Sequence, residues 1–357
     1  MRTANRSRQD LTMFSISDLI RPELLKFKPY LSARHLSSNG EIMLDANENP
    51  YDDENLNRYP DPNQIALRQS LSEYVDAPIE NIFVGSGSDE IIDLLIRLFC
   101  RPGRDEVLII EPTYGMYRVC AEVNGINVSS CLLNDEFDIE MSTLRSALSR
   151  KTKIIFCCSP NNPTGNRLSV TDLLEYTKSE GIITVIDEAY LEFSKTDSVS
   201  RLRDEYPNLV VLRTLSKAWG LAGIRLGYAV TTPETVSYLM SIKLPYNVDV
   251  LSSNSALEAL SNRTNMEKKL SEIISERKRL TGEFNKLTVF EEVYPSEANF
   301  ILLKSEYSAK IKQTLSDNGI LVRDRSADPL LENCLRITVG TPDQNDKLLN
   351  VLGGMKL

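Results

Sequence analysis

Lys217 lies just past the apolar run 209–212, is flanked by Ser216 and is followed by small residues. An amine at the end of such a run is placed to form a Schiff base with an aldehyde, while the neighbouring hydroxyl and backbone groups can hold a phosphate. Most lysines in loops between a strand and a helix are solvated surface charges, so Lys217 alone carries little weight. Other polar residues of the chain distinguish a Schiff-base lysine from a solvated surface lysine.

An acid, an amide and an arginine lie at positions that suit the same chemistry. Asp187 ends an apolar run and precedes Tyr190 by three residues. An acid at the carboxyl end of an α/β strand faces the ligand crevice, where it can pair with a protonated pyridine nitrogen. Asn162 lies in a stretch rich in turn residues and can donate to a phenolic oxygen. Arg225 adds a fixed positive charge for a phosphate.

The stretch Gly85-Ser-Gly-Ser-Asp89 precedes a periodic apolar run that ends at Phe99. Free backbone N–H groups at the start of such a helix form an anion site. Together with the amine, the acid, the amide and the arginine, this anion site predicts that the chain binds pyridoxal phosphate (PLP). The five signals in this order are far more specific than any one of them.

The elements that must position these residues follow an alternating pattern between residues 81 and 230. Short β-rich runs alternate with helical stretches such as 169–178, and these runs are 82–84, 106–110, 128–133, 153–158, 182–187, 209–213 and 226–230. The alternation predicts an α/β fold in which helices cover a mostly parallel sheet. The catalytic groups then belong in the loops beyond the strand ends.

After residue 245 the pattern changes and predicts a smaller α+β domain. Helical segments dominate residues 249–287, and the segments that follow are 299–303, a helix to 318, 320–324, 334–338 and a closing helix at 342–352. We therefore expect three parts. These are an N-terminal arm (1–45) that packs with the small domain, a large PLP-binding domain (46–247) and a small C-terminal α+β domain (248–357).

The charge and the apolar content of the chain limit the classes of partner that it can bind. The chain has 357 residues and a hydrophobic fraction of 41%, which is ordinary for a soluble globular protein. The formal net charge is −9 and no basic run is interleaved with aromatics, which argues against nucleic acid and anionic membranes as partners. No apolar run reaches the roughly 18 residues of a membrane span. The arginines among residues 1–14 resemble a transit peptide only slightly, so we expect a cytoplasmic protein.

The cysteines and the single histidine limit the kinds of catalytic and metal site that the chain can contain. The six cysteines form no C-x-x-C pair, which favours free core thiols in a reducing cytosol. The one histidine, His35, lies beside Arg34 in a polar segment, which argues against a catalytic triad with histidine, and a single histidine excludes metal sites with several histidines. We expect no bound metal, and other groups must carry the proton transfers.

The chain resembles the fold-type I PLP aminotransferases and, within them, the histidinol-phosphate aminotransferases. The resemblance covers nearly the whole chain after the N-terminal arm and rests on residues 28–30, 44–50, 57–60, 87–90, 112–117, 159–165, 187–190, 213–217, 225 and 335–340. The Asp, Asn and Lys motifs indicate only the superfamily, whereas 44–50, 57–60 and 335–340 indicate the narrower family. Trp219 is a departure, because the family more often has Phe there.

The resemblance implies roles for individual residues. Lys217 would bind the cofactor covalently, Asp187 would keep its ring nitrogen protonated, and Tyr190 would complete the catalytic set. The other implied cofactor contacts are Gly87, Ser88, Asp89, Tyr114, Asn162, Ser216, Arg225 and, from the neighbouring subunit of a homodimer, Tyr59. The implied substrate contacts are Tyr30, Asn162, Arg323 and Arg336.

The reaction that the resemblance implies is amino transfer from L-histidinol phosphate to 2-oxoglutarate, a step of histidine biosynthesis. Two other reactions on the same scaffold remain open, namely amino transfer from aromatic amino acids and decarboxylation of phosphothreonine. A PLP-binding regulator without turnover is a further alternative. The intact Lys217, Asp187 and Arg336 argue against that regulator.

Overall fold

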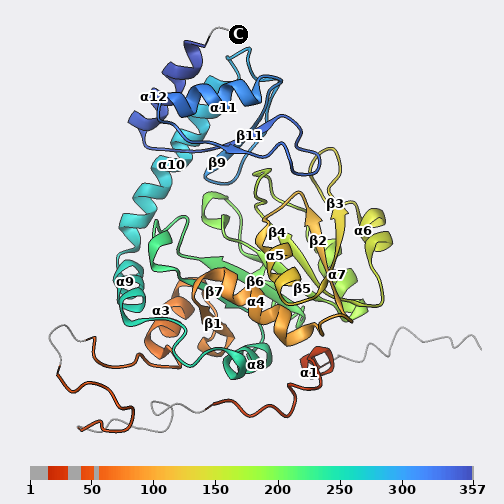
Figure 1. Cartoon of the computed structure of the whole chain (residues 1–357), viewed down its shortest axis with the longest axis vertical. Helices are drawn as coiled ribbons and strands as arrows, with labels where there is room; N and C mark the ends of the chain where they lie inside the picture. The colour runs from red at the N-terminus through yellow and green to blue at the C-terminus, as the bar shows by residue number, and fades with distance from the viewer. Residues whose placement is uncertain (1–14, 31–41, 52–55, 356–357) are drawn as a thin grey trace, which may run out of the picture.

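The computed structural model describes residues 15–30, 42–51 and 56–355, so His35 and the arginines of residues 1–14 lie outside the described residues. Figure 1 shows a larger lower body built on a broad sheet and a smaller upper body that contains the end of the chain. Helix α10 (Arg263–Phe284) runs up one side, from the larger body to the smaller one. The predicted site residues come from both bodies.

A seven-stranded sheet forms the centre of the larger body, in the order β1-β7-β6-β5-β4-β2-β3. The strands are β1 (Ile82–Gly85), β2 (Glu106–Glu111), β3 (Asn127–Leu132), β4 (Thr152–Cys158), β5 (Ile183–Asp187), β6 (Leu209–Thr214) and β7 (Gly227–Val230). In this sheet β7 runs antiparallel to both of its neighbours, β1 and β6, and the other neighbouring pairs are parallel. The predicted α/β fold with a mostly parallel sheet is therefore confirmed.

Helices cover both faces of this sheet. They are α1 (Ile16–Leu19), α3 (Ile65–Val75), α4 (Gly87–Phe99), α5 (Met116–Val123), α6 (Met141–Ala147), α7 (Thr171–Glu180), α8 (Pro233–Ile242) and α9 (Val250–Ser261), with the 3-10 turns η1 (Ile79–Asn81), η2 (Leu191–Phe193), η3 (Val199–Leu202) and η4 (Ala222–Ile224). Along β4, Phe156 and Cys158 join the core under α4 and α5, whereas Ile155 and Cys157 join the core under α6 and α7. This alternation follows from the two-residue period of a strand and explains the continuous apolar runs.

The carboxyl ends of the parallel strands meet at one edge of the sheet. Cys158 at the end of β4 lies opposite Asp187 on β5, and Asp187 lies opposite Leu212 on β6. The loops beyond these ends carry Asn162 and Lys217. As the sequence predicted, the reactive side chains are brought to the crevice at this edge.

An antiparallel sheet in the order β10-β11-β9-β8 forms the smaller body. Its strands and helices are β8 (Glu292–Val293), β9 (Phe300–Lys304), β10 (Arg323–Asp324), β11 (Cys334–Thr338), α11 (Ser308–Asp317) and α12 (Pro342–Gly353). A capping box between Thr341 and Gln344 begins α12, which packs with α10 and α11 over the sheet. On the sheet, Arg323 lies directly opposite Arg336.

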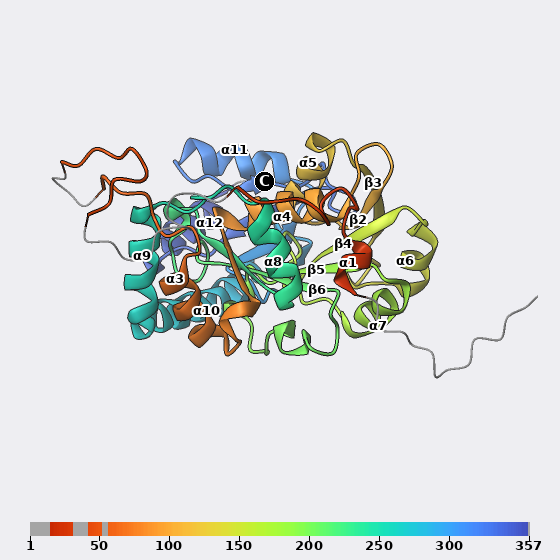
Figure 2. The same ribbon diagram turned by 90° about the horizontal axis from the view of Figure 1, so that it is seen from below.

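Two segments pack on a different body from the one that the sequence predicted. Ile16 and Ile20 are buried in the core under α4 and α8, and the Arg21 N–H donates to the Leu98 carbonyl at 3.1 Å. Figure 2 shows α1 near α8 on the underside of the larger body, although we expected the arm to pack with the small domain. Helix α9 likewise packs on α3. Helical periodicity shows which face is apolar but not which body covers it, so the domain limits at residues 45 and 247 stay predictions.

Candidate active site

A cavity of about 560 Å³ opens between the two bodies at the carboxyl edge of the large sheet. Its lining includes Ser88, Asp89, Tyr114, Asn162, Asp187, Tyr190, Ser216, Lys217 and Arg225 from the larger body and Arg323 and Arg336 from the smaller one. The structure thus gathers most of the predicted site residues around one space. The side chains that border the space also include Cys158, Thr214 and Arg325, for which the sequence suggested no role.

Lys217 lies in the loop that follows β6. The Ser216 N–H donates to the Thr214 hydroxyl at 3.0 Å, which fixes the turn that presents the lysine. Its Nζ lies 5.7 Å from the centroid of the Tyr190 ring. Although part of the Lys217 side chain is exposed, desolvation by the cavity wall and then the positive charge of Arg336 lower its pKa, and Asp187 acts in the opposite direction. The amine therefore loses its proton, and becomes nucleophilic, at a lower pH than the amine of a free lysine does.

Asp187 is buried, with 3% of its surface exposed. Its Oδ2 accepts a hydrogen bond from the Tyr117 hydroxyl at 2.7 Å, and its Oδ1 accepts one from the Ala189 N–H at 3.0 Å. Burial raises the pKa of Asp187, and the bond from Tyr117 is the largest influence that lowers it. A buried carboxylate held by two neutral donors suits a cation as its remaining partner.

The first turn of α4 and Arg225 form an anion cradle. Gly87 has a φ of +80°, and a Cβ at this position would lie 2.6 Å from Arg225 Nη2. A Cβ on Gly227 would lie 2.3 Å from the Ser88 backbone nitrogen, so neither glycine can be replaced without a shift of the backbone or of the guanidinium. Asp89 accepts hydrogen bonds from Arg225 at 3.2 Å and from Tyr114 at 3.0 Å. Ser88, Asp89 and Arg225 therefore border one space at the start of α4, where free backbone N–H groups favour an anion.

This donor set fits PLP. The start of α4, Ser88, Ser216 and Arg225 would hold the phosphate, Asp187 would pair with the ring nitrogen, and Lys217 would bind the aldehyde. Tyr114 would lie against the ring, and Asn162 and Tyr190 would hold the phenolic oxygen. Each polar group of the cofactor thus has a matching residue in or beside the cavity.

Three arginines of the smaller body face the same cavity. Arg336 donates to the Asn162 Oδ1 across the two bodies, and its Cζ lies 5.2 Å from the Phe300 ring centroid. Arg325 forms an ion pair with Asp328 and donates to the Thr113 carbonyl at 3.4 Å. Arg325 lies two residues after Arg323, and residues with this spacing in an extended segment lie on the same face. This spacing is the sequence signal that could have predicted Arg325 as a cavity residue.

The other two predicted site residues lie elsewhere. Tyr59 is 51% exposed and stacks on Tyr246, with ring centroids 4.5 Å apart, in a separate hollow beside Leu251. Tyr30 is 75% exposed. A single copy of the chain does not bring either tyrosine to Lys217.

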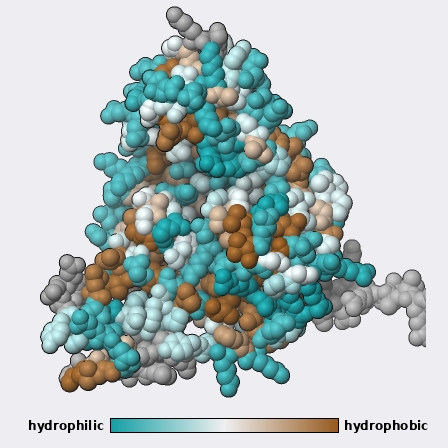
Figure 3. Space-filling view, viewed as in Figure 1, coloured by the Kyte–Doolittle hydropathy of each residue, from teal (hydrophilic) through white to brown (hydrophobic). Residues whose placement is uncertain are grey.

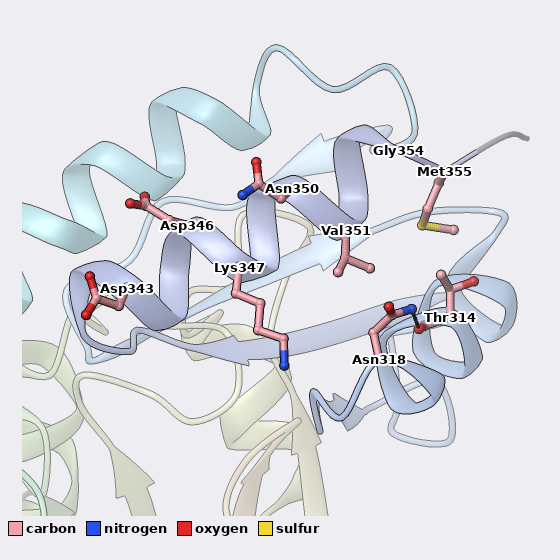
Figure 4. A pocket seen from close by; sticks show the side chains of 9 residues that line it. All are labelled: Thr314, Asn318, Asp343, Asp346, Lys347, Asn350, Val351, Gly354 and Met355. Atoms are coloured by element: carbon pink, nitrogen blue, oxygen red, sulfur yellow. Dashed lines mark hydrogen bonds between the residues drawn. The ribbon is translucent and has the colours of Figure 1, made fainter.

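A further groove lies between α11 and α12 of the smaller body (Figure 4). Its charged side chains are Asp343, Asp346 and Lys347 on α12, and Asp346 is already paired with Arg279 at 2.8 Å. The groove shares no lining residue with the cavity around Lys217. The cavity between the two bodies is therefore the candidate active site.

Comparison with known proteins agrees with this geometry. Residues 35–352 match the family described as aminotransferase class I and II. The histidinol-phosphate aminotransferase of Cytophaga hutchinsonii is 46% identical over 343 residues, which cover 95% of this chain and 99% of that one. The enzyme of the same name from Parabacteroides distasonis is 44% identical, with 97% and 100% covered. The solved histidinol-phosphate aminotransferase of Clostridium acetobutylicum has a TM-score of 0.77 at 27% identity and covers 84% of this chain and 91% of its own. This chain belongs to the class I and II aminotransferases, which depend on PLP, and within them to the histidinol-phosphate aminotransferases.

Proposed function

We propose that this enzyme transfers the amino group of L-histidinol phosphate to 2-oxoglutarate and yields imidazole acetol phosphate and glutamate, a step of histidine biosynthesis. One observation carries the proposal beyond the family. Arginines of the smaller body line the same cavity as Lys217, so a substrate that reacts at Lys217 can place an anionic end among them.

Lys217 carries the proton transfers in this proposal. Its Nζ takes the proton from the substrate Cα, because its lowered pKa leaves the amine free to accept it. PLP, when bound, supplies the electron sink that makes this proton acidic. Asp187 keeps the sink effective, since its negative charge favours a protonated ring nitrogen. Tyr190 and Asn162 border the same space and are assigned to the phenolic oxygen.

Substrate recognition is assigned to Arg323 and Arg336. L-histidinol phosphate ends in a phosphate, whereas 2-oxoglutarate ends in a carboxylate, so one cationic pocket must accept both in turn. The two arginines are opposite each other on β10 and β11 and present a pair of planar guanidinium groups to either anion. Arg325 adds a third positive charge, which is offset by Asp328.

A second copy of the chain completes the site. Leu244 is 72% exposed and Leu251 is 61% exposed, close to the stacked Tyr59 and Tyr246. In Figure 3 apolar side chains gather at the lower left, over α9 and the segment that precedes α3. An exposed apolar surface of this kind is typical of a subunit interface. We assign the phosphate contact to Tyr59 of the partner subunit in a homodimer, and Tyr30 to the wall of the closed site.

The free thiols support a reducing cellular compartment. All six cysteines are free and buried, which suits a reducing compartment, and we place the enzyme in the cytoplasm. None of the helices in the described part of the chain is long and apolar enough to cross a membrane.

A panel of amine donors tests the proposed reaction. L-histidinol phosphate, L-histidinol, L-phenylalanine and O-phospho-L-threonine are each supplied with 2-oxoglutarate, and glutamate and carbon dioxide are measured. We expect L-histidinol phosphate to be the best donor and L-histidinol to have a kcat/KM lower by about tenfold or more, because it lacks the anion. Equal rates for these two donors would instead favour an aromatic aminotransferase. Carbon dioxide from phosphothreonine would favour the decarboxylase.

A further inference from the structure

Tyr117 bonds to Asp187 from outside the cavity. It lies on α5, is fully buried and is not among the residues that line the site. Its hydroxyl donates to Asp187 Oδ2 at 2.7 Å. The proposed reaction uses Asp187 but gives Tyr117 no part, so this contact needs its own explanation.

The ring of Tyr117 is held on two sides. It stacks on Phe156 of β4, with centroids 4.9 Å apart and planes within 6° of parallel. It also lies edge-on to Tyr114, at 5.6 Å and 84°. A tyrosine has only two side-chain torsions to its ring, so these contacts determine where its hydroxyl points.

The hydroxyl is a donor in this pair. Burial raises the pKa of Tyr117 well above its ordinary value, so the phenol keeps its proton. The bond in turn lowers the pKa of the buried Asp187 carboxyl and so favours its ionised form. The Ala189 N–H occupies the other carboxylate oxygen, which leaves the carboxylate oriented from both sides.

We propose that Tyr117 is a positioning residue that keeps Asp187 ionised and aimed at the cofactor nitrogen, so that the shared proton stays on that nitrogen. This inference rests on the proposed function, because it assumes that Asp187 pairs with the PLP ring. Without the hydroxyl the carboxylate becomes more basic, and the proton moves toward Asp187. The energetic benefit of the contact between the carboxylate and the nitrogen then declines, even though Asp187 is still present.

The affinity of the full-length protein for two cofactors tests the inference without any amine donor. One cofactor is PLP, and the other is the analogue in which a carbon replaces the ring nitrogen. The dissociation constant of the analogue divided by that of PLP measures how much the contact between Asp187 and the ring nitrogen strengthens binding. Because a hydrogen bond to a charged group is worth about tenfold or more in an equilibrium constant, Tyr117→Phe should reduce this ratio about tenfold.

Tyr206→Phe is the matched control. Tyr206 is also buried, and its hydroxyl also donates to a carboxylate oxygen, that of Glu175, at 2.7 Å, but neither residue lines the cavity. This variant should keep the wild-type ratio. If Tyr117→Phe does not fold, the double variant with Asp187→Asn removes both partners, and its ratio should equal that of Asp187→Asn alone.

The outcomes separate the two proposals. A wild-type protein that binds both cofactors equally contradicts the assigned role of Asp187, and that of Tyr117 with it. A wild-type protein that prefers PLP, with the same preference in Tyr117→Phe, overturns the inference and leaves the role of Asp187 intact. A loss of preference in both Tyr117→Phe and Tyr206→Phe also overturns the inference, since the effect would then not depend on Asp187.

Discussion

Arg336 of the smaller body donates a hydrogen bond to the side-chain oxygen of Asn162 in the larger body. This bond crosses the cavity wall and joins a residue assigned to substrate with one assigned to the cofactor. The arginine also lowers the pKa of Lys217. By these assignments, a single guanidinium contributes to substrate binding and also to the pKa of the proposed proton acceptor, and the two effects can be measured separately.

Replacement of Lys217 by alanine should lower turnover by several orders of magnitude, because the nucleophile and the proton carrier are lost together. The variant should still bind PLP through the other cavity residues. In the wild type, borohydride should fix the cofactor to Lys217, as read by peptide mass. Lys243, which is buried and does not line the cavity, should stay unlabelled. Near-normal turnover of Lys217→Ala would rule out the assignment.

Asp187→Asn should fold and yet lose most of its activity, because a neutral amide cannot hold the ring nitrogen protonated. Asp187→Glu keeps the charge and should retain far more activity. The comparison is one of kcat values measured with saturating PLP. Mild and equal losses in the two variants would mean that Asp187 serves only the fold.

Mixed dimers test the role of Tyr59. Subunits with Tyr59→Phe and subunits with Lys217→Ala are combined, and activity is measured after exchange. Each heterodimer should contain one site that lacks both changes, so activity should exceed the sum of the two parent proteins. Tyr59 lines a hollow that is separate from the cavity around Lys217, so this result needs a second copy of the chain to bring Tyr59 to the site. A monomeric protein with full activity would refute the shared site.

Arg336→Ala should lower kcat/KM about ten- to a hundredfold for both L-histidinol phosphate and 2-oxoglutarate, because one charge-assisted contact is lost to each anion. Arg336→Lys should recover only part of this loss, since an ammonium cannot form the paired fork. The advantage of L-histidinol phosphate over L-histidinol should shrink in Arg336→Ala. An unchanged advantage would move phosphate recognition to other residues.

The pH profile should report the coupling between Arg336 and Lys217. The positive charge of Arg336 lowers the pKa of Lys217, so its removal should raise that pKa. More of the lysine is then protonated at a given pH, and the acid-side inflection of kcat in Arg336→Gln should move to higher pH. Arg325→Gln is the control, since it removes a cavity arginine that is not among the main influences on Lys217. A shift of equal size in both variants would indicate a general change of charge instead.

The sequence predicted the parts of the fold that depend on short-range pattern. The run at 153–158 is a strand because it is buried on both faces, and Asp187 and Asn162 lie at the predicted edge because parallel strands end together. The packing of α1 and α9 was not predictable in this way, since it depends on distant partners. Tyr117 was visible only as part of a motif, because its bond to Asp187 joins residues 70 positions apart.

The division of the site between the two bodies has a consequence for redesign. The residues assigned to the cofactor by this copy of the chain lie between Gly87 and Arg225, whereas the three cavity arginines lie between Arg323 and Arg336. A chimera that exchanges β10, β11 and the segment between them should therefore alter the choice of amine donor. It would keep the loop that carries Lys217 but would change the charge that Arg336 places near this lysine. Asn162 and Thr113, which accept from Arg336 and Arg325, are the two graft points at which such an exchange would have to be matched.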